Sequence, residues 1–327
     1  MPVTIGIPRS LLFYKYFPLW KSFLEELGAE VTVSGPTSKV VLQEGLRFSV
    51  DEACLPVKVA FGHVAALKDK ADYIFVPRLV SVSPREYICP KFLGFPDMVR
   101  HCVPGLPGII DANINLYRSE NDLYRQLAGI GSLICKNPFK VAAAFRRAAN
   151  HQKRFIRRME AGMLPEQAMG PGEEKTGRET GKNETVAVIG HPYNIYDGFI
   201  NMNLIRRLEG FGVNVVTADN VPEAVVNRYA GTLKKRLFWT LGRRMVGAAY
   251  YFMDNPGIKG LIHVASFACG PDSMTGELIE RRTRRAGNKP FLNLTLDEHT
   301  GEAGLVTRIE AFMDMVIMKQ TAACSEG

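Results

Sequence analysis

Residues 3–33 have the sequence VTIGIPRSLLFYKYFPLWKSFLEELGAEVTV, and this stretch predicts the fold class. Its short apolar run Val3–Ile7 predicts a strand that ends before a proline. Leu11–Leu27 carries apolar side chains at helical spacing and stops at Gly28, which predicts a helix. Ala29–Val33 predicts the next strand. Strand, helix and strand in this order form a βαβ unit, which is typical of an α/β fold with a parallel sheet.

The second half of the chain starts the same pattern again. Thr185–Gly190 predicts a strand, Asn201–Glu209 a helix and Val213–Thr217 the next strand. We therefore predict two doubly wound, Rossmann-like lobes of similar design, each with a parallel sheet. The other predicted strands are Tyr73–Pro77, Gly260–Ser266 and Pro290–Leu296, and the other predicted helices are Lys39–Phe48, Pro56–Leu67, Pro138–Met163, Ser273–Ala286 and Ala303–Lys319.

A polar segment separates the two halves. Residues 164–184 contain AMGPGEEKTGRETGKNE, which has almost no large apolar side chains and cannot bury enough surface to hold itself in place. We predict an N-terminal lobe over residues 1–163 that ends in a long basic helix, a linker over 164–184 and a C-terminal lobe over 185–327.

The composition is that of a globular protein, with 46% hydrophobic and 23% charged residues. No apolar window is long enough for a membrane span, and the N-terminus MPVTIGIPRS lacks the pattern of a signal peptide. The sequence therefore predicts a cytoplasmic location and no membrane contact.

The net charge of +8 is concentrated in two predicted helices. Neither cluster has the interleaved aromatic residues of a nucleic-acid platform, so we expect no nucleic-acid partner. Each cluster is either a solvated helix face or a docking surface for a phosphate-bearing ligand or an acidic partner protein. The clusters comprise Arg146, Arg147, Lys153, Arg154, Arg157 and Arg158 in the first helix, and Arg281, Arg282, Arg284 and Arg285 in the second.

Three of the six cysteines share a local setting. Cys54 in DEACLP, Cys89 in YICPKFLG and Cys269 in FACGPDS each lie at or just before a predicted helix start, with Pro or Gly within two residues. A helix N-terminus stabilises thiolate, the form that binds iron. The competing interpretation is that they are small buried hydrophobes. Zinc is a further alternative, although a closed zinc site usually has paired ligands a few residues apart.

The chain resembles the uncharacterised family that is related to 2-hydroxyacyl-CoA dehydratases and associated with their ATP-dependent activases. The resemblance covers nearly the whole chain outside residues 164–184. It is carried by GIPRSLLFYKYFPLWKSFLEELGAEV, VDEACLPVKVAFGHV, DYIFVPRLVSV, EYICPKFLGFPD, ASFACGPDS and TLDEHTGEAGLVTRIEAF.

The resemblance implies a [4Fe-4S] cluster in the cleft between the two lobes. Matched by motif, its ligands would be Cys54, Cys89 and Cys269, and its fourth iron could take a non-cysteine ligand. Cys102 in RHCVPG could add a fourth thiolate, whereas Cys135, taken as part of a helix start, and Cys324 are expected to be bystanders. Electrons would come from an activase of the sugar-kinase, Hsp70 and actin ATPase superfamily, whose phosphate-binding signature this chain lacks.

Several polar residues are candidates for the surroundings of the cluster. His191 directly follows a predicted strand, and Glu298 and His299 in TLDEHTGE follow another, so they are candidates for proton transfer. Asp272 follows Cys269 and is a further neighbour. The alternative for TLDEHTGE is a helix cap, with Asp297 as the capping residue.

The sequence supports three functional hypotheses. The first is an anaerobic [4Fe-4S] protein that accepts low-potential electrons and acts in a dehydratase-like or reductive reaction on acyl-CoA or another small molecule. The second is a non-catalytic electron carrier or assembly subunit for an activase-type ATPase. The third is a zinc-stabilised binding module. We expect a homo- or heterodimer in each case.

Overall fold

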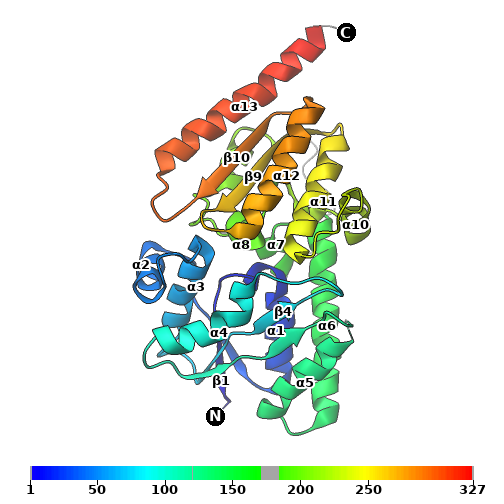
Figure 1. Ribbon diagram of the computed structural model, residues 1–327. Helices are drawn as coiled ribbons and strands as arrows, with labels where there is room; N and C mark the ends of the chain where they lie inside the picture. Colours follow the sequence, from blue (N-terminus) through cyan, green and yellow to red (C-terminus); the bar gives the residue numbers. More distant parts are fainter. Residues whose placement is uncertain (1, 120, 171–183, 326–327) are drawn as a thin grey trace. The chain divides into compact units, whose positions relative to one another are not determined.

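The computed structural model describes residues 2–119, 121–170 and 184–325, with side chains as far as residue 318. The chain forms two compact units (Figure 1). The first contains residues up to 158 together with 165–170 and 238–240, and the second contains the other described residues. Each unit has its own parallel sheet flanked by helices.

The first unit is built on a four-stranded parallel sheet in the order β2-β1-β3-β5. Its strands are β1 (Thr4–Ile7), β2 (Glu30–Val33), β3 (Tyr73–Phe75) and β5 (Gly108–Ile110), and β4 (Arg78–Ser81) pairs separately with β6 (Asn113–Asn115). Its helices are α1 (Phe13–Leu27), α2 (Lys39–Phe48), α3 (Leu55–Ala65), α4 (Pro90–Cys102), α5 (Asp122–Ile134), α6 (Pro138–Glu160) and α7 (Pro165–Met169).

The second unit repeats this sheet order. Its strands, in the order β10-β9-β7-β8, are β7 (Thr185–Gly190), β8 (Asn214–Thr217), β9 (Ile258–Ser266) and β10 (Phe291–Leu296). Its helices are α8 (Pro192–Ile195), α9 (Leu204–Gly210), a 3-10 turn (Ala218–Asn220), α10 (Glu223–Ala230), α11 (Thr240–Asp254), α12 (Gly270–Ala286) and α13 (Glu302–Ser325). In both units the first strand lies between the second and the third, which confirms the predicted two α/β lobes of similar design.

Helices cover both faces of each sheet. Gly260 of β9 faces α13, because an added Cβ there would lie 2.7 Å from the Phe312 ring. His263 of the same strand faces α12, because an added Cβ on Gly276 would lie 2.7 Å from the His263 ring. An odd separation along a strand puts these two residues on opposite faces. In the first sheet, Trp20 of α1 packs on Phe75, while Ile74 packs with α3 and α4. Both sheets are therefore doubly wound.

Five helices and three strands outside the predicted linker have no predicted range, and part of the predicted linker is helical. The strands are β4, β5 and β6, and the helices are α4, of which only the start at Cys89 was predicted, α5, α8, α10 and α11. α4 contains Pro96, and α11 is buried around most of its circumference, so neither shows a clear amphipathic pattern. Residues Pro165–Met169, placed in the linker, form α7 and bury Pro165 and Ala168. Residues 171–183 of the predicted linker lie outside the described residues.

Within the part of the chain that the structure describes, no helix combines the length and the apolar character needed to span a bilayer.

A pair of glycines lets α2 and α3 pack backbone to backbone. An added Cβ on Gly45 of α2 would lie 1.9 Å from the carbonyl oxygen of Lys58, and one on Gly62 of α3 would lie 1.8 Å from that of Val41. Any side chain at either position would overlap with backbone atoms that cannot rotate away. The close approach fixes α3, and with it the start of that helix at Cys54.

The buried His63 of α3 predicts a loss of stability in acid. Its ring nitrogens lie 2.9 Å from the hydroxyl oxygens of Ser34 and Thr37. Burial and the nearby charge of Arg9 lower its pKa from about 6.5 to about 4. Between those pH values the unfolded chain binds a proton that the folded chain does not. The free energy of unfolding therefore decreases as the pH is lowered from 6.5 to 4, by about 3 kcal/mol in total. Urea unfolding of the protein at a series of pH values measures this change in the free energy of unfolding.

The matched variants isolate His63 from other acid effects. His63→Gln removes the titrating group and is expected to flatten the pH dependence between 6.5 and 4. His101→Gln changes an exposed histidine and is expected to leave that dependence unchanged. An unaltered slope in His63→Gln would contradict the assignment.

Candidate metal centre

Three cysteines occupy the same position at three helix starts. Cys54, Cys89 and Cys269 are the N-cap residues of α3, α4 and α12, and each helix has a proline in its first two positions. Proline suits this position because the N–H that it lacks has no partner within the helix. Cys54 and Cys89 are half-buried, and Cys269 is 8% exposed. Each cysteine is therefore at the positive end of a helix dipole.

In the first unit, the two N-cap cysteines lie at the same end of the contact between α3 and α4. The ring of Phe61, seven residues after Cys54, packs edge-on against that of Phe95, six residues after Cys89, with centroids 5.4 Å apart. Lys91 donates a hydrogen bond of 3.2 Å to the carbonyl oxygen of Glu52, which ties the two helix starts together. α3 and α4 therefore begin at the same end of their contact, as a shared metal site requires.

The other cysteines do not share this setting. α4 ends at Cys102, thirteen residues after Cys89, so helix geometry separates the two by about 20 Å, more than one cubane can bridge. Cys135 is the C-cap of α5, so the prediction that it belongs to a helix start was wrong. The side chain of Cys324 lies outside the described residues.

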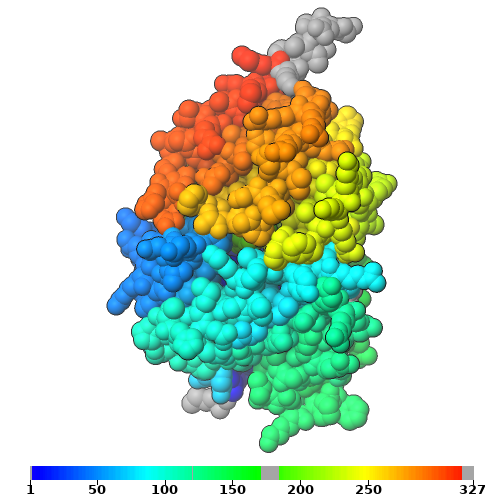
Figure 2. Space-filling model, viewed as in Figure 1, coloured from blue at the N-terminus to red at the C-terminus, as the bar shows by residue number. Residues whose placement is uncertain are grey.

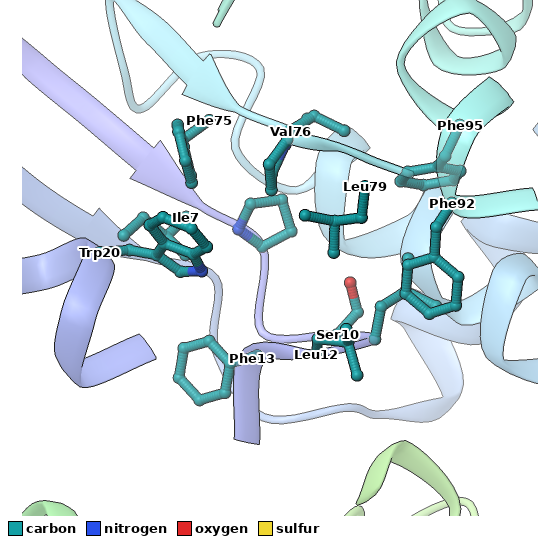
Figure 3. Close-up of a pocket in the computed structure, with 13 residues that line it drawn as sticks. Ile7, Ser10, Leu12, Phe13, Trp20, Phe75, Val76, Leu79, Phe92 and Phe95 are labelled. Carbon is teal, nitrogen blue, oxygen red and sulfur yellow. The ribbon is translucent and has the colours of Figure 1, made fainter. Parts of the chain in front are cut away.

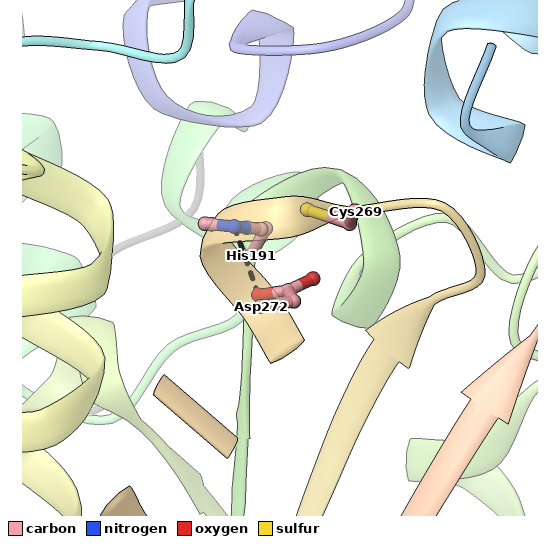
Figure 4. A group of neighbouring side chains, drawn as sticks. All are labelled: His191, Cys269 and Asp272. Atoms are coloured by element: carbon pink, nitrogen blue, oxygen red, sulfur yellow. Dashed lines mark ion pairs between the residues drawn. The ribbon is translucent and has the colours of Figure 1, made fainter. Parts of the chain in front are cut away.

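In the second unit, His191, Cys269 and Asp272 form a buried cluster (Figure 4). His191 follows β7 and is the N-cap of α8, while Cys269 and Asp272 lie at the start of α12, after β9. Their ligand atoms all lie within 4.8 Å of one another. The His191 Nε2 atom is 2.9 Å from Asp272 Oδ1. Thiolate, imidazole and carboxylate are the three kinds of ligand that zinc and other transition metals take.

The sheet order explains why these residues meet. β7 and β9 are neighbours, although β8 lies between them in sequence, so their carboxyl ends form the topological switch point of this sheet. Ligands of open α/β sheets bind at this point. Ala268, directly before Cys269, has a left-handed backbone with φ 62°, a conformation that costs a non-glycine residue about 1–2 kcal/mol. The strain is consistent with a turn that serves to aim the cysteine.

A second layer of hydrogen bonds holds the cluster. Asn194 donates to Asp272 Oδ2 at 3.5 Å and accepts a hydrogen bond of 2.8 Å from the Ser266 hydroxyl. Asn201 in turn donates to the carbonyl oxygen of Asn194 at 2.9 Å. Supporting bonds of this kind orient metal ligands and catalytic groups. Ser266 was not among the residues singled out from the sequence, because nothing near it in the chain marks its role.

The electrostatics of the cluster favour an ionised Asp272. Burial alone would raise the pKa of this carboxyl group, but the His191 ring, His263 and a hydrogen bond from Cys269 together hold it below its ordinary value. The Nδ1 atom of His191 is also buried, and no described residue gives it a hydrogen-bond partner. A buried ring nitrogen without a partner among the described residues is available as a metal ligand or proton-transfer position.

Glu298 and His299 lie at the carboxyl end of β10, on the same sheet edge, but they are not part of the cluster. His299 is exposed. Asp297 accepts hydrogen bonds from the His299 N–H at 2.9 Å and from the Thr300 hydroxyl at 2.8 Å, and the Thr300 bond is the main cause that lowers its pKa. The TLDEHTGE motif thus forms a turn before α13 that is stabilised by hydrogen bonds to Asp297. This resembles the helix cap that was the alternative to a role in proton transfer.

The first unit has a small apolar cavity at its own switch point, between the carboxyl ends of β1 and β3 (Figure 3). Its volume is about 60 Å³. Ser10 contributes a hydroxyl group among side chains that include Trp20, Phe75 and Phe92. The N–H of Phe92 donates to the carbonyl oxygen of Cys89 at 2.9 Å, so the cavity wall is tied to the cysteine at the start of α4. A small hydrocarbon group fits such a space.

The family of the chain follows from a match over most of its length. No curated protein matches the chain. The sequence profile of the family described as "CoA enzyme activase uncharacterised domain" (DUF2229) matches residues 4–221, which include the sheet of the first unit and the first two strands of the second. The profile confirms the relationship to the activase and dehydratase system. The chain therefore belongs to the CoA enzyme activase uncharacterised domain family.

Proposed function

We propose that this protein holds a [4Fe-4S] cluster on Cys54, Cys89 and Cys269 and accepts low-potential electrons from an ATP-dependent activase. The observation that supports it best is the shared N-cap position of the three cysteines. Family membership links the chain to the activase system. In this proposal the first unit would supply two of the thiolates, Cys54 and Cys89, and the second unit would supply the third, Cys269.

The residues suit an iron–sulfur cluster chemically. Cysteine thiolates are the ligands of such clusters, and the three cysteines lie at helix N-termini. The cluster would supply single electrons at low potential, and with three thiolates one iron would remain open to another ligand. Cys54 and Cys89 begin helices at the same end of one contact, which preorganises two of the three positions.

His191 and Asp272 would act beside Cys269 as the proton-handling pair. Asp272 orients the His191 ring through Nε2, at 2.9 Å, and leaves the buried Nδ1 position to hold or release a proton. Glu298 and His299 would be reserve proton donors at the same sheet edge. The apolar cavity beside Cys89 would hold the hydrocarbon part of an acyl-CoA or another small-molecule substrate. A dehydratase-like or reductive reaction would use these groups together.

Two alternatives remain distinct in chemistry. In an electron carrier or assembly subunit for the activase, the same cluster would be present without a substrate. A zinc-stabilised module is favoured by a separate observation, the His191–Cys269–Asp272 cluster, which offers three zinc ligands within one unit. A cytoplasmic location and a homo- or heterodimer belong to the proposal in each case.

Metal analysis of anaerobically purified protein tests the proposal directly. We expect about four irons and four sulfides per chain, a brown colour and a paramagnetic resonance signal on reduction, all lost in air. Stoichiometric zinc without sulfide would overturn the iron–sulfur proposal in favour of the zinc module. An iron–sulfur protein whose reduced spectrum does not respond to any acyl-CoA would favour the electron carrier over the enzyme.

A further inference from the structure

One face of α12 carries arginines beside a large pocket in the second unit. Leu278, Arg281, Arg282 and Arg285 follow one another at helical spacing, so they lie on the same side of the helix. Together with Tyr250 of α11 they line a pocket of about 510 Å³. Figures 1 and 2 show α11, in yellow, beside α12, in orange. The pocket has the size of a typical small-molecule site, roughly 300–1,000 Å³.

The inner wall of this pocket is apolar. Leu233, Tyr250, Met253 and Leu278 belong to, or pack against, the hydrophobic core between the sheet and these helices. Tyr250 and Met253 are almost fully buried. The pocket is therefore not a flat solvated helix face, since it combines an aromatic and aliphatic floor with a charged rim.

Two of the rim arginines form no ion pair with a described residue, although the Asp254 carboxylate also lines the pocket. Arg281 pairs with Glu277, and no described carboxylate forms an ion pair with Arg282 or Arg285. The Arg282 guanidinium lies 4.4 Å from the centre of the Tyr250 ring, which holds it at the pocket. Burial raises the pKa of Tyr250, and the nearby charges of Arg282 and Arg285 oppose that rise. The guanidinium groups at the pocket outnumber its one carboxylate, so the pocket has an excess of positive charge that attracts an anion.

We propose that this pocket binds a phosphate ester that carries an aromatic or apolar portion, a ligand of nucleotide size. Guanidinium groups match the geometry of phosphate oxygens and can bind them in pairs. The Leu233, Tyr250, Met253 and Leu278 surface would contact the rest of the ligand. The site lies outside the cysteine cluster and does not rest on the proposed metal centre.

Calorimetric titration of the full-length protein with ADP tests this site. ADP is expected to bind saturably at low salt, adenosine far more weakly, and the affinity for ADP to fall as salt is raised. Arg282→Gln and Arg285→Gln are each expected to weaken ADP binding by roughly tenfold. The matched control is Arg284→Gln, since Arg284 belongs to the same helix, pairs with Glu280 and does not line the pocket. It is expected to change binding less than about twofold.

Three outcomes would overturn the proposal. The first is no saturable ADP binding at millimolar concentration. The second is an equal loss of affinity in Arg284→Gln, which would indicate general attraction to a basic surface. The third is tight binding of polyglutamate without binding of ADP, which would assign the face to an acidic partner segment. Thermal unfolding of each variant shows that the fold is intact, and Arg285→Gln keeps the test valid if loss of the Arg282–Tyr250 contact destabilises the protein.

Discussion

Gly62→Ala is expected to destabilise the first unit by about 3 kcal/mol or more. Alanine normally stabilises a helix interior by about 1 kcal/mol relative to glycine, so the expected sign is the reverse of the helix propensity. The cause is the contact with α2, where the new Cβ would lie 1.8 Å from the carbonyl oxygen of Val41. Because this oxygen belongs to the backbone of a helix, α2 and α3 must move apart.

Gly94 of α4 provides the matched control. It also lies inside a helix, but apart from its chain neighbours and the nearby backbone of its own helix, no atom lies within 4 Å of an added Cβ. Gly94→Ala is therefore expected to leave stability unchanged or to raise it slightly. Gly45→Ala should resemble Gly62→Ala, since its Cβ would meet the Lys58 carbonyl oxygen. Urea unfolding compares all three, and a Gly62→Ala protein as stable as Gly94→Ala would show that the two helices do not pack this closely.

The glycine contact also links packing to the proposed metal centre. Cys54 starts α3, and the position of that helix depends on its contact with α2. A shift of α3 would move the Cys54 sulfur relative to that of Cys89, which is held by α4. We therefore expect Gly45→Ala and Gly62→Ala to lose metal more readily than the decrease in their free energy of unfolding alone would predict.

Seven of the eight strands in the two four-stranded sheets were predicted, because their signals are local; β5, three residues long, was missed. The apolar run of β7, the helical spacing of α1 and the stop at Gly28 each lie within a short window of sequence. The sheet order adds information that no such window holds. β7 and β9 are adjacent only in the folded chain, and this adjacency brings His191 to Cys269 and Asp272. The family resemblance placed these residues around one predicted cluster, but no local pattern shows that their ligand atoms lie within 4.8 Å of one another.

The features that escaped prediction depend on long-range contacts. A glycine within a helical pattern usually indicates a less stable helix, and nothing near Gly62 in the sequence shows that the backbone of another helix packs against it. The strain at Ala268 is likewise invisible, since alanine has no preference for positive φ. Proline after each cysteine was visible, and it did identify the helix starts at Cys54, Cys89 and Cys269.

Single Cys→Ser changes at positions 54, 89 and 269 are expected to abolish the cluster. A serine hydroxyl is not a thiolate, so each change would leave an iron without its ligand. Iron and sulfide in anaerobically purified protein should fall from about four of each per chain to near zero. Far-ultraviolet circular dichroism should show that the fold is retained, because serine closely matches cysteine in size.

The same series separates the iron–sulfur proposal from the zinc alternative. In the proposal, all three changes remove the metal, while Cys102→Ser leaves it bound, because Cys102 ends α4 about 20 Å from Cys89. A zinc ion on His191, Cys269 and Asp272 would instead be lost only in Cys269→Ser and would survive both Cys54→Ser and Cys89→Ser. Loss of iron in Cys102→Ser would contradict the ligand set. The pattern across four variants therefore identifies which thiols hold the metal and whether the two units share it.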